Sequence, residues 1–374
     1  MWVNKLLEPS GIKINGDNLW DVKILNPGVY ERIKAEGSLG LGESYMEGWW
    51  ECKNLDQFFY KLFLAKIPDK INFSLPVFFA IISAKLFNLQ RKSRAFEVGK
   101  KHYNLDNKLF SAMLGESMTY SCGYWKKAKN LDSAEFAKLD LICKKLNLKP
   151  GQKILDIGCG WGSFAKYAAE NYGVSVVGIT ISKEQAEFAK KHCKGLKVEI
   201  RLQDYRELNV HSANSRQEKF DHIVSIGMFE HVGPKNHKEY LKVARKCLKD
   251  DGLFLLHTIG GLTSENSSDP WLNKYIFPNG VLPSLKQITT VCEKLFIIED
   301  AHNFGADYDK TLMAWHKNFN KAWPHFKNKY NERFFRMWNY YLLSCAGLFR
   351  ARQIQLWQIV LSPNGVPSGY KPVR

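Results

Sequence analysis

Paired cysteine motifs are absent from the 374-residue sequence, which has no Cys-x-x-Cys pair and no cysteine–histidine spacing typical of zinc sites. Its eight cysteines therefore indicate buried thiols in a reducing cytosol, and we predict no bound metal. The first 20 residues lack the apolar core and small-residue cleavage site of a signal peptide. The best apolar run, Phe73 to Ala84, has 12 residues, whereas roughly 20 are needed to span a bilayer. We therefore expect a soluble chain that touches membranes only from outside.

Acidic side chains are also in short supply. Lysine and arginine number 54 and aspartate and glutamate 37, which gives a formal net charge of +17. Such an excess favours a polyanionic partner, and both nucleic acid and an anionic membrane surface satisfy it. Charge alone does not choose between the two.

The chain is longer than one hydrophobic core usually serves, so two domains are expected. We predict a small N-terminal domain over residues 1–85, a basic linker over 86–106 and a catalytic domain over 107–374. In the first of these, four glycines and a tryptophan pair between Gly37 and Trp50 predict tight turns against aromatic packing. A helix is expected over 55–66. The linker is either a solvated face or a contact for lipid headgroups.

Strands and helices alternate from Asn107 onward, which predicts an α/β fold with a parallel sheet covered by helices on both faces. Strands are expected over 153–157, 175–180, 197–202, 220–226 and 252–258, and helices over 133–146, 162–172, 182–193 and 236–249. Segments 295–300 and 354–361 are candidates for an antiparallel edge. Between them, Thr311 to Arg352 has the pattern of long aromatic-rich helices. The polar stretch 211–218 is expected to form a surface loop.

The sharpest local signal is the sequence KILDIGCGWG, an apolar strand that enters a turn at Gly158, Gly160 and Gly162. Glycines at such a turn let the backbone approach a ligand closely. Asp156 before the first glycine, together with the spacing, favours binding of S-adenosylmethionine. The alternative is a nucleotide-dependent oxidoreductase, whose motif requires glycine or alanine where Ser163 stands.

Polar residues follow the next two strands of the predicted sheet. Thr180 and Gln185 are placed to hydrogen-bond the ribose or the amino-acid tail of the donor, although Ser182 and Gln185 also have the pattern of a helix cap. Asp204 is a candidate acceptor for the adenine amino group, with Tyr205 beside the ring. The alternative for Asp204 is an aspartate that begins a loop without contacting a ligand.

Glu230 and His257 lie near the ends of the fourth and fifth predicted strands. Ligands of open α/β sheets bind outside the carboxyl ends of the strands, so both residues are expected in the crevice of the glycine loop. A lone buried histidine is usually a satisfied core residue, but this position favours a functional one.

The sequence resembles cyclopropane-fatty-acyl-phospholipid synthases, relatives of the mycolic-acid cyclopropane synthases, over essentially its whole length. The resemblance rests on several motifs, which are GSLGLGESYMEGWWEC, HYNLDNKLF, MTYSCGYW, LDIGCGWG, VVGITIS, LQDYREL, GMFEHVGPKN, LLHTIG, DPWLNKYIFPNG, HNFGADYDKTLMAW and FRARQIQLWQ. It implies the Rossmann-like mixed sheet of class I S-adenosylmethionine methyltransferases. It also implies a bicarbonate site formed by Cys122, Glu230, His257, the backbone of Ile259, and Tyr308. The expected residues for binding the S-adenosyl-L-methionine co-substrate are Tyr120, Ser121, Asp156, Gly158, Gly160, Thr180, Gln185, Asp204 and Tyr205.

The chemistry that the resemblance implies is addition of a methylene to the cis double bond of an unsaturated phospholipid acyl chain. Alkene attack on the sulfonium methyl gives a carbocation, and bound bicarbonate serves as the base that removes a proton so that the ring closes. The implied location is the cytoplasmic surface of the inner membrane, where unsaturated phospholipids are the partners. The resemblance also implies a homodimer, and no nucleic-acid partner is expected.

Three alternatives remain open from the sequence. Some relatives stop at methyl transfer and leave a methyl branch or a methoxy group, and those making oxygenated products depart from the pattern at Glu230. A nucleic-acid methyltransferase agrees with the basic charge, although no added binding module or target-base motif is visible. A non-catalytic lipid-binding protein on the same fold is disfavoured by intact Cys122, Glu230, His257 and Tyr308.

Overall fold

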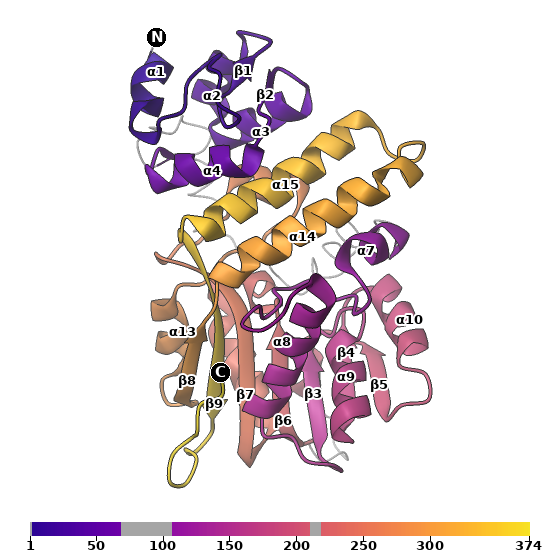
Figure 1. Ribbon diagram of the computed structural model, residues 1–374. Helices are drawn as coiled ribbons and strands as arrows, with labels where there is room; N and C mark the ends of the chain where they lie inside the picture. The colour runs from indigo at the N-terminus through magenta and orange to yellow at the C-terminus, as the bar shows by residue number, and fades with distance from the viewer. Residues whose placement is uncertain (1, 69–106, 210–217) are drawn as a thin grey trace. The chain divides into compact units, whose positions relative to one another are not determined.

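The computed structural model describes residues 2–68, 107–209 and 218–374 (Figure 1). Internal contacts divide the chain into two compact units, each built from separate segments. We call them the helical unit, Met1–Asn88, Asn266–Pro278 and Gly305–Gln355, and the sheet unit, Leu89–Glu265, Asn279–Phe304 and Leu356–Arg374. The predicted linker 86–106 and the apolar run Phe73–Ala84 lie outside the described residues, and so does nearly all of the predicted loop 211–218. The predicted domain boundaries stay a prediction.

The sheet unit contains a mixed sheet whose strand order, over the described residues, is β5-β4-β3-β6-β7-β9-β8. The strands are β3 (Lys153–Ile157), β4 (Ser175–Thr180), β5 (Val198–Leu202), β6 (Phe220–Ile226), β7 (Leu248–Gly261), β8 (Ile297–Asn303) and β9 (Ile354–Ser362). Strands β3 to β7 pair in parallel, whereas β8 and β9 pair antiparallel at the edge. This order confirms the predicted α/β class and the antiparallel edge, and the fold is that of class I S-adenosylmethionine methyltransferases.

Alternation of side chains along the strands gives the sheet two apolar faces. On β7, Leu253 and Leu255 belong to one buried cluster, whereas Phe254 and Leu256 belong to the other. Helices α8 (Leu131–Lys145) and α9 (Ser163–Tyr172) cover the first face, and α11 (His237–Cys247) and α13 (Leu285–Cys292) cover the second. The sheet is therefore buried on both sides, and polar residues gather where its strands end.

Local capping explains where several helices of the sheet unit begin. Asn130 and Ser133 form a reciprocal capping box at the start of α8. The Ser182 hydroxyl accepts the Gln185 N–H at the start of α10 (Lys183–His192), so Ser182 is the predicted cap. Gln185 does not complete a capping box, because the Ser182 N–H donates to the Thr180 hydroxyl oxygen instead. The remaining elements of the unit are α7 (Asn107–Leu114) and the short 3₁₀ turns η3 (Tyr205–Asn209), η4 (Phe229–His231) and η5 (Pro234–Asn236).

The helical unit consists mainly of short N-terminal elements and two long helices. Its elements over the described residues are α1 (Trp2–Leu7), η1 (Glu8–Ser10), β1 (Lys23–Ile24), α2 (Val29–Glu36), α3 (Ser38–Met46), β2 (Trp50–Glu51), α4 (Leu55–Leu64), α12 (Pro270–Tyr275), α14 (Ala306–Ala322), η6 (Trp323–His325) and α15 (Glu332–Arg350). The predicted helix over 55–66 and the predicted long aromatic-rich helices are confirmed. Helix α15 packs against α14, α4 and α3.

The glycine-rich segment between Gly37 and Trp50 is mostly helical, which corrects the prediction of successive tight turns. Two of its glycines lie inside α3, where the absence of a side chain lets neighbours approach closely. A Cβ on Gly40 would lie 2.4 Å from the Arg32 carbonyl oxygen of α2, and one on Gly42 would lie 2.3 Å from the Trp271 ring. The predicted aromatic packing is present, because Trp50 is buried against Tyr45 and Phe58.

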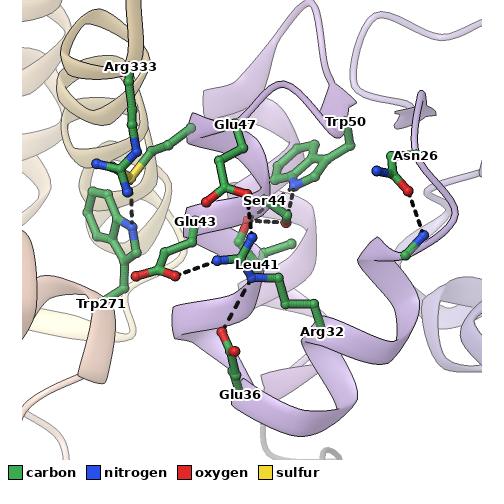
Figure 2. A network of polar contacts seen from close by, with 12 residues as sticks. Asn26, Arg32, Glu36, Leu41, Glu43, Ser44, Glu47, Trp50, Trp271 and Arg333 are labelled. Carbon is green, nitrogen blue, oxygen red and sulfur yellow. Dashed lines mark hydrogen bonds and ion pairs between the residues drawn. The ribbon is translucent and has the colours of Figure 1, made fainter.

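A network of ion pairs around Arg32 joins α2 to α3 (Figure 2). The Arg32 guanidinium contacts Glu36, Glu43 and Glu47 at 3.4, 2.5 and 2.6 Å. Glu43 also accepts bonds from Lys274 Nζ at 2.5 Å and the Tyr275 hydroxyl at 2.7 Å. Burial raises the pKa of Glu43, but the bonds from Lys274 and Tyr275 outweigh it and hold that pKa below its ordinary value. The network supplies each of its charged groups with an opposite charge.

All eight cysteines are free thiols, and seven of them are buried, as the sequence predicts. None of the helices in the described part of the chain combines the length and the apolar character needed to cross a membrane.

Candidate active site

The glycine-rich loop after β3 leads directly into α9. Gly158, Gly160 and Gly162 have φ angles of 86°, 54° and 85°, values that residues with a side chain rarely adopt. A Cβ on Gly158 would lie 2.6 Å from the Met228 side chain, which therefore occupies the space that a side chain at position 158 would need. At Gly160, a Cβ would meet Gln185 Nε2, at 4.0 Å, and no other described atom within that distance. The loop therefore exposes backbone at Gly160, as a close-fitting ligand requires.

Thr180 and Gln185 lie beside this loop. The Thr180 hydroxyl donates to Gln185 Oε1 at 3.0 Å, and both residues are buried. The Ser182 hydroxyl binds the Gln185 backbone N–H, whereas the Gln185 side chain points toward Thr180 and Gly160. The structure thus brings together three of the predicted donor-binding positions, from the ends of β3 and β4 and the start of α10.

Asp204 follows β5 and is 1% exposed. Its carboxylate accepts two bonds from the Arg206 guanidinium, at 2.8 Å to Oδ1 and 2.7 Å to Oδ2, and the Arg206 N–H at 2.9 Å. A carboxylate oxygen has two acceptor positions, so Oδ2 can still accept an adenine amino group. Tyr205 packs edge-on against Tyr240, with ring centroids 5.0 Å apart, and burial raises its pKa to about 12.

Asp156 lies in the central strand β3, where it pairs with Gly178 of β4 and Val224 of β6. It is 1% exposed, and burial raises the pKa of its carboxyl to about 7, against the opposing charge of Lys138. The side chain is thus buried in the central strand, two residues before Gly158. Its predicted role in binding the donor stays a prediction.

The loop before α8 carries Tyr120, Ser121 and Cys122. The Tyr120 ring packs against Phe110 and Trp161, with centroid distances of 5.4 and 6.4 Å. Ser121 is nearly buried and accepts a bond from Lys138 Nζ at 3.0 Å. Cys122 is fully buried, and its thiol donates to the carbonyl oxygen of Gly123 at 3.1 Å. Trp161 belongs to the glycine loop, so the loop that carries Tyr120 packs against the glycine loop of the predicted donor site.

Glu230 lies in η4, just after β6, and its side chain reaches Ile259 on β7. Its Oε1 accepts the Ile259 N–H at 2.7 Å, and its carbonyl oxygen accepts the Val281 N–H at 2.8 Å. Burial raises the pKa of the Glu230 carboxyl to about 7, although the backbone N–H groups oppose this shift. Near neutral pH the group can therefore both accept and release a proton. The backbone of Ile259 is one of the predicted anion contacts, and its N–H is already engaged by Glu230.

His257 lies on β7 directly opposite Ile226 of β6 and is 1% exposed. Its Nδ1 lies 3.3 Å from Nε2 of Gln358 on β9. Burial, reinforced by the charges of Lys138 and Lys145, holds the pKa of His257 well below its ordinary value, so the ring is neutral at pH 7. With the Gln358 amide oriented so that its nitrogen faces the ring, Nδ1 is the acceptor, and this orientation predicts that the ring proton is on Nε2.

Two atoms of Glu230 and His257 have no hydrogen-bond partner among the described residues. They are Glu230 Oε2 and His257 Nε2, one a carboxylate oxygen and the other a ring N–H, and both are buried. Buried polar atoms are nearly always paired, so an unpaired acceptor and donor at the ends of adjacent strands indicate a polar ligand. A small oxyanion that also has a hydroxyl group offers the donor and the acceptor that complement these two atoms.

Tyr308 belongs to the helical unit, whereas the four other predicted bicarbonate residues belong to the sheet unit. It lies near the start of α14, where its ring stacks on Phe349 at 4.5 Å and meets Trp315 edge-on at 5.9 Å. Its predicted place beside Cys122 and His257 stays a prediction.

A family model described as mycolic acid cyclopropane synthetase matches residues 90–359. The chain belongs to this family. The cyclopropane-fatty-acyl-phospholipid synthase of Escherichia coli is 56% identical over 371 residues, which cover 99% of this chain and 95% of that one. The cyclopropane synthases are methyltransferases that use S-adenosylmethionine, and this chain is an enzyme of that class.

Two solved cyclopropane synthases have the same fold. One, from Mycobacterium tuberculosis, is 31% identical, covers 74% of this chain and 99% of its own, and has a TM-score of 0.66. The second, a mycolic acid cyclopropane synthase in complex with S-adenosylhomocysteine and CTAB, is 30% identical, covers 71% and 97% of the two chains, and has a TM-score of 0.64. These matches leave a quarter or more of this chain uncovered, whereas the Escherichia coli match covers nearly all of it.

Sequence reasoning missed three buried polar residues around the site, Gln358, Lys138 and Glu135. The two charged residues had a visible signal, because in α8 they fall on the apolar stripe that includes Leu131 and Ile142 at helical spacing. A charged residue on such a stripe is buried and needs a partner. Gln358 had no such signal, since its contact with His257 depends on the strand order β7-β9.

Proposed function

We propose that this cyclopropane synthase acts on phospholipids, transferring a methylene from S-adenosylmethionine to the cis double bond of an unsaturated acyl chain. The observation that carries the proposal is the 56% identity to a cyclopropane-fatty-acyl-phospholipid synthase, because that match extends over 99% of the chain. Cyclopropane mycolic acid synthases match only 71%. The phospholipid-acting relative therefore also accounts for segments outside the shared catalytic region.

The donor is held, in this proposal, by residues that the fold gathers at the ends of β3, β4 and β5. Backbone at Gly158 and Gly160 approaches the ligand, Thr180 and Gln185 offer hydroxyl and amide groups, and Asp204 offers Oδ2. Tyr120 and Ser121 complete the site from the loop before α8. Each assignment extends the sequence prediction, and the contacts among these side chains support it.

We further propose that bicarbonate is held by Cys122, Glu230, His257, Ile259 and Tyr308. The unpaired atoms Glu230 Oε2 and His257 Nε2 support this, since the first accepts a proton and the second donates one. When bound, bicarbonate would supply the base that takes a proton from the newly added methyl group. The Ile259 N–H is engaged by Glu230, and the Ile259 carbonyl oxygen accepts the Thr258 hydroxyl at 3.0 Å, so the second acceptor position of that oxygen is the part of the Ile259 backbone that we propose for bicarbonate.

The test is turnover of labelled S-adenosylmethionine on vesicles of unsaturated phosphatidylglycerol, in buffer with bicarbonate and in buffer stripped of carbon dioxide. Proton NMR of the extracted acyl chains detects cyclopropane protons, which a methyl-branched alkene of equal mass lacks. Ring formation that falls in the stripped buffer and returns with added bicarbonate supports both parts. Methyl-branched product, or no transfer to lipid, contradicts the proposed function.

Replacement of Cys122 by serine tests the anion site separately. Serine keeps a hydrogen-bond donor at that position but changes its length and acidity, so the bicarbonate concentration for half-maximal rate is expected to rise about tenfold. Cys143, also buried but within the α8–α9 core, provides the matched control. The Cys143→Ser variant should keep the native bicarbonate dependence; equal dependence in both variants and the native chain contradicts the role of Cys122.

We also propose that the enzyme binds the cytoplasmic surface of the inner membrane peripherally and as a homodimer. The net charge of +17 supports attraction to anionic headgroups, each well-placed basic residue contributing about 1 kcal/mol. Flotation with anionic and with neutral vesicles measures the preference, and light scattering after size-exclusion chromatography measures the mass. Equal binding to both vesicles would contradict the electrostatic attachment, and a single-chain mass would contradict the dimer.

A further inference from the structure

Helix α8 contains a lysine side chain that is almost completely buried. Lys138 is 1% exposed, although an ammonium group is costly to remove from water unless charges and hydrogen bonds compensate it. Its Nζ donates to the Ser121 hydroxyl at 3.0 Å. The carboxylates of Glu135 and Asp156 and the thiol of Cys122 are close enough to act on its charge. The ammonium therefore stands between α8, the central strand β3 and the loop that carries Tyr120, Ser121 and Cys122.

The same stretch of α8 holds this loop at further points. The Tyr124 N–H donates to the Ala134 carbonyl oxygen at 2.8 Å. A Cβ on Gly123 would lie 2.8 Å from the Ala134 Cβ, so the loop backbone lies directly on the helix. The Ser117 hydroxyl bonds to Glu135, next in sequence to Ala134. Of these contacts, the bond from Lys138 is the one that ends on a predicted donor-binding side chain.

We propose that Lys138 is a positioning residue of the methyl-donor site, where its buried ammonium fixes Ser121 and thereby the loop Tyr120–Cys122 against helix α8. The inference rests on the proposed function in that Ser121 contacts S-adenosylmethionine. Lys138 acts through the Ser121 hydroxyl, whose orientation it sets by donating to the oxygen. The hydroxyl proton is then directed away from the ammonium and is available to an acceptor on the donor molecule.

A second buried lysine provides a matched control. Lys145 lies seven residues later in α8 and is fully buried, and its Nζ is 3.7 Å from Asp300 and 3.1 Å from His302 Nδ1. Burial lowers the pKa of both lysines. The two therefore resemble each other in burial and helix position but differ in what they hold, since none of the hydrogen bonds found for Lys145 reaches Ser121.

The experiment compares Lys138→Met with Lys145→Met by calorimetric titration of S-adenosylhomocysteine and by steady-state kinetics. Because Lys138→Met leaves Glu135 without its buried cation, Lys138→Met/Glu135→Gln is measured as well, which removes both charges and keeps an acceptor for Ser117. We expect either Lys138 variant to weaken S-adenosylhomocysteine binding at least tenfold and to raise the KM for S-adenosylmethionine similarly. The KM for phospholipid should stay within twofold. Lys145→Met should lower thermal stability and keep native affinity for S-adenosylhomocysteine.

A double-mutant cycle with Ser121→Ala decides whether Lys138 acts through that hydroxyl. If it does, adding Ser121→Ala to Lys138→Met weakens binding less than threefold further, although Ser121→Ala alone weakens it in the native chain. Independent, multiplying effects would overturn the proposal. So would a folded Lys138 variant with native affinity, or an equal loss of affinity in Lys145→Met. Titration of S-adenosylhomocysteine needs no lipid, so these outcomes remain decisive even if no phospholipid is cyclopropanated.

Discussion

The Arg32 network of the helical unit and the Glu230–His257 pair of the sheet unit treat buried polar groups in opposite ways. Around Arg32, each of three carboxylates has a cation within 3.4 Å (Figure 2). Glu43 has two further donors, Lys274 and Tyr275. Just after β6 and on the neighbouring strand β7, Glu230 Oε2 and His257 Nε2 have no partner among the residues that the structure describes. The Arg32 network therefore pairs its charges within the protein, whereas Glu230 and His257 each keep one atom unpaired.

A saturated network needs no ligand and contributes mainly to stability, whereas unpaired buried groups raise the free energy of the folded chain until a ligand satisfies them. The opposite pKa shifts of two glutamates express this contrast. The pKa of Glu43 is below its ordinary value, because its donors outweigh burial, and that of Glu230 is raised to about 7 by burial. We therefore expect changes in the first region to alter stability and changes in the second to alter catalysis.

Glu230→Gln should have the largest effect. The amide keeps an acceptor for the Ile259 N–H but cannot take up a proton, so ring closure is expected to fall at least 1000-fold, about 4 kcal/mol of barrier. The measurement is the initial rate of cyclopropane formation at saturating donor and lipid. Glu43→Gln is the matched control, which should lose stability and keep its rate. Comparable rate losses in the two variants would erase the contrast between the regions.

The raised pKa of Glu230 also predicts how stability changes with pH. A carboxyl whose folded pKa of about 7 exceeds its unfolded value of 4.5 keeps its proton longer when folded, so its contribution to stability is present below pH 4.5 and is lost as pH rises to 7. The native chain should therefore lose about 1.4 kcal/mol per pH unit relative to Glu230→Gln across that interval. Asp156 titrates in both proteins and cancels. Denaturant melts between pH 5 and 8 measure the difference, and a constant difference would contradict burial of an ionisable Glu230.

Arg32→Met should alter stability without altering donor binding. Three carboxylates would lose their shared cation, and the free energy of unfolding is expected to fall by about 2 kcal/mol, less than for a fully buried pair because Glu43 keeps Lys274 and Tyr275. Urea melts measure the loss. Affinity for S-adenosylhomocysteine should stay within twofold of the native chain, since every predicted donor contact belongs to the sheet unit; loss of affinity at native stability would reverse the interpretation.

Most of the sheet unit was predictable because its signals are local. Strand and helix periodicity, the glycines after β3 and the Ser182 cap each act within a few residues of sequence, and each was found where predicted. The glycines of α3 were wrongly predicted to form tight turns, because glycine is required there by tertiary contacts and not by the local backbone conformation. Gly42 admits the Trp271 ring from a segment more than 200 residues away, and helix formation there depends on that packing.

The polar partners of the candidate site show the same limit. Glu230 and His257 could be predicted near each other from the strand pattern, since Glu230 follows β6 and His257 lies on β7 opposite the last residue of β6. The carboxylate of Asp204 was foreseen, but its bidentate pairing with Arg206 two residues later was not, since many geometries suit that spacing. Gln358 lies 101 residues from His257, and only the order of β7 and β9 brings it into contact.

Gln358→Leu should have the smallest effect of these variants. It tests whether Gln358 orients the His257 ring through its contact with Nδ1. Leucine has nearly the same volume but no donor, so the His257 proton becomes free to occupy Nδ1 instead of Nε2. Removal of a group that fixes a histidine tautomer reduces activity about tenfold or more, and we expect a tenfold fall in the rate of ring formation. Gln355→Leu, on the same strand but bonded to Arg352, is the matched control. Nitrogen-15 NMR of labelled histidine reports the tautomer directly: the native chain should show His257 protonated at Nε2, and a proton on Nδ1 would mean that Gln358 accepts through Oε1 and leaves Nε2 as a lone pair facing the site.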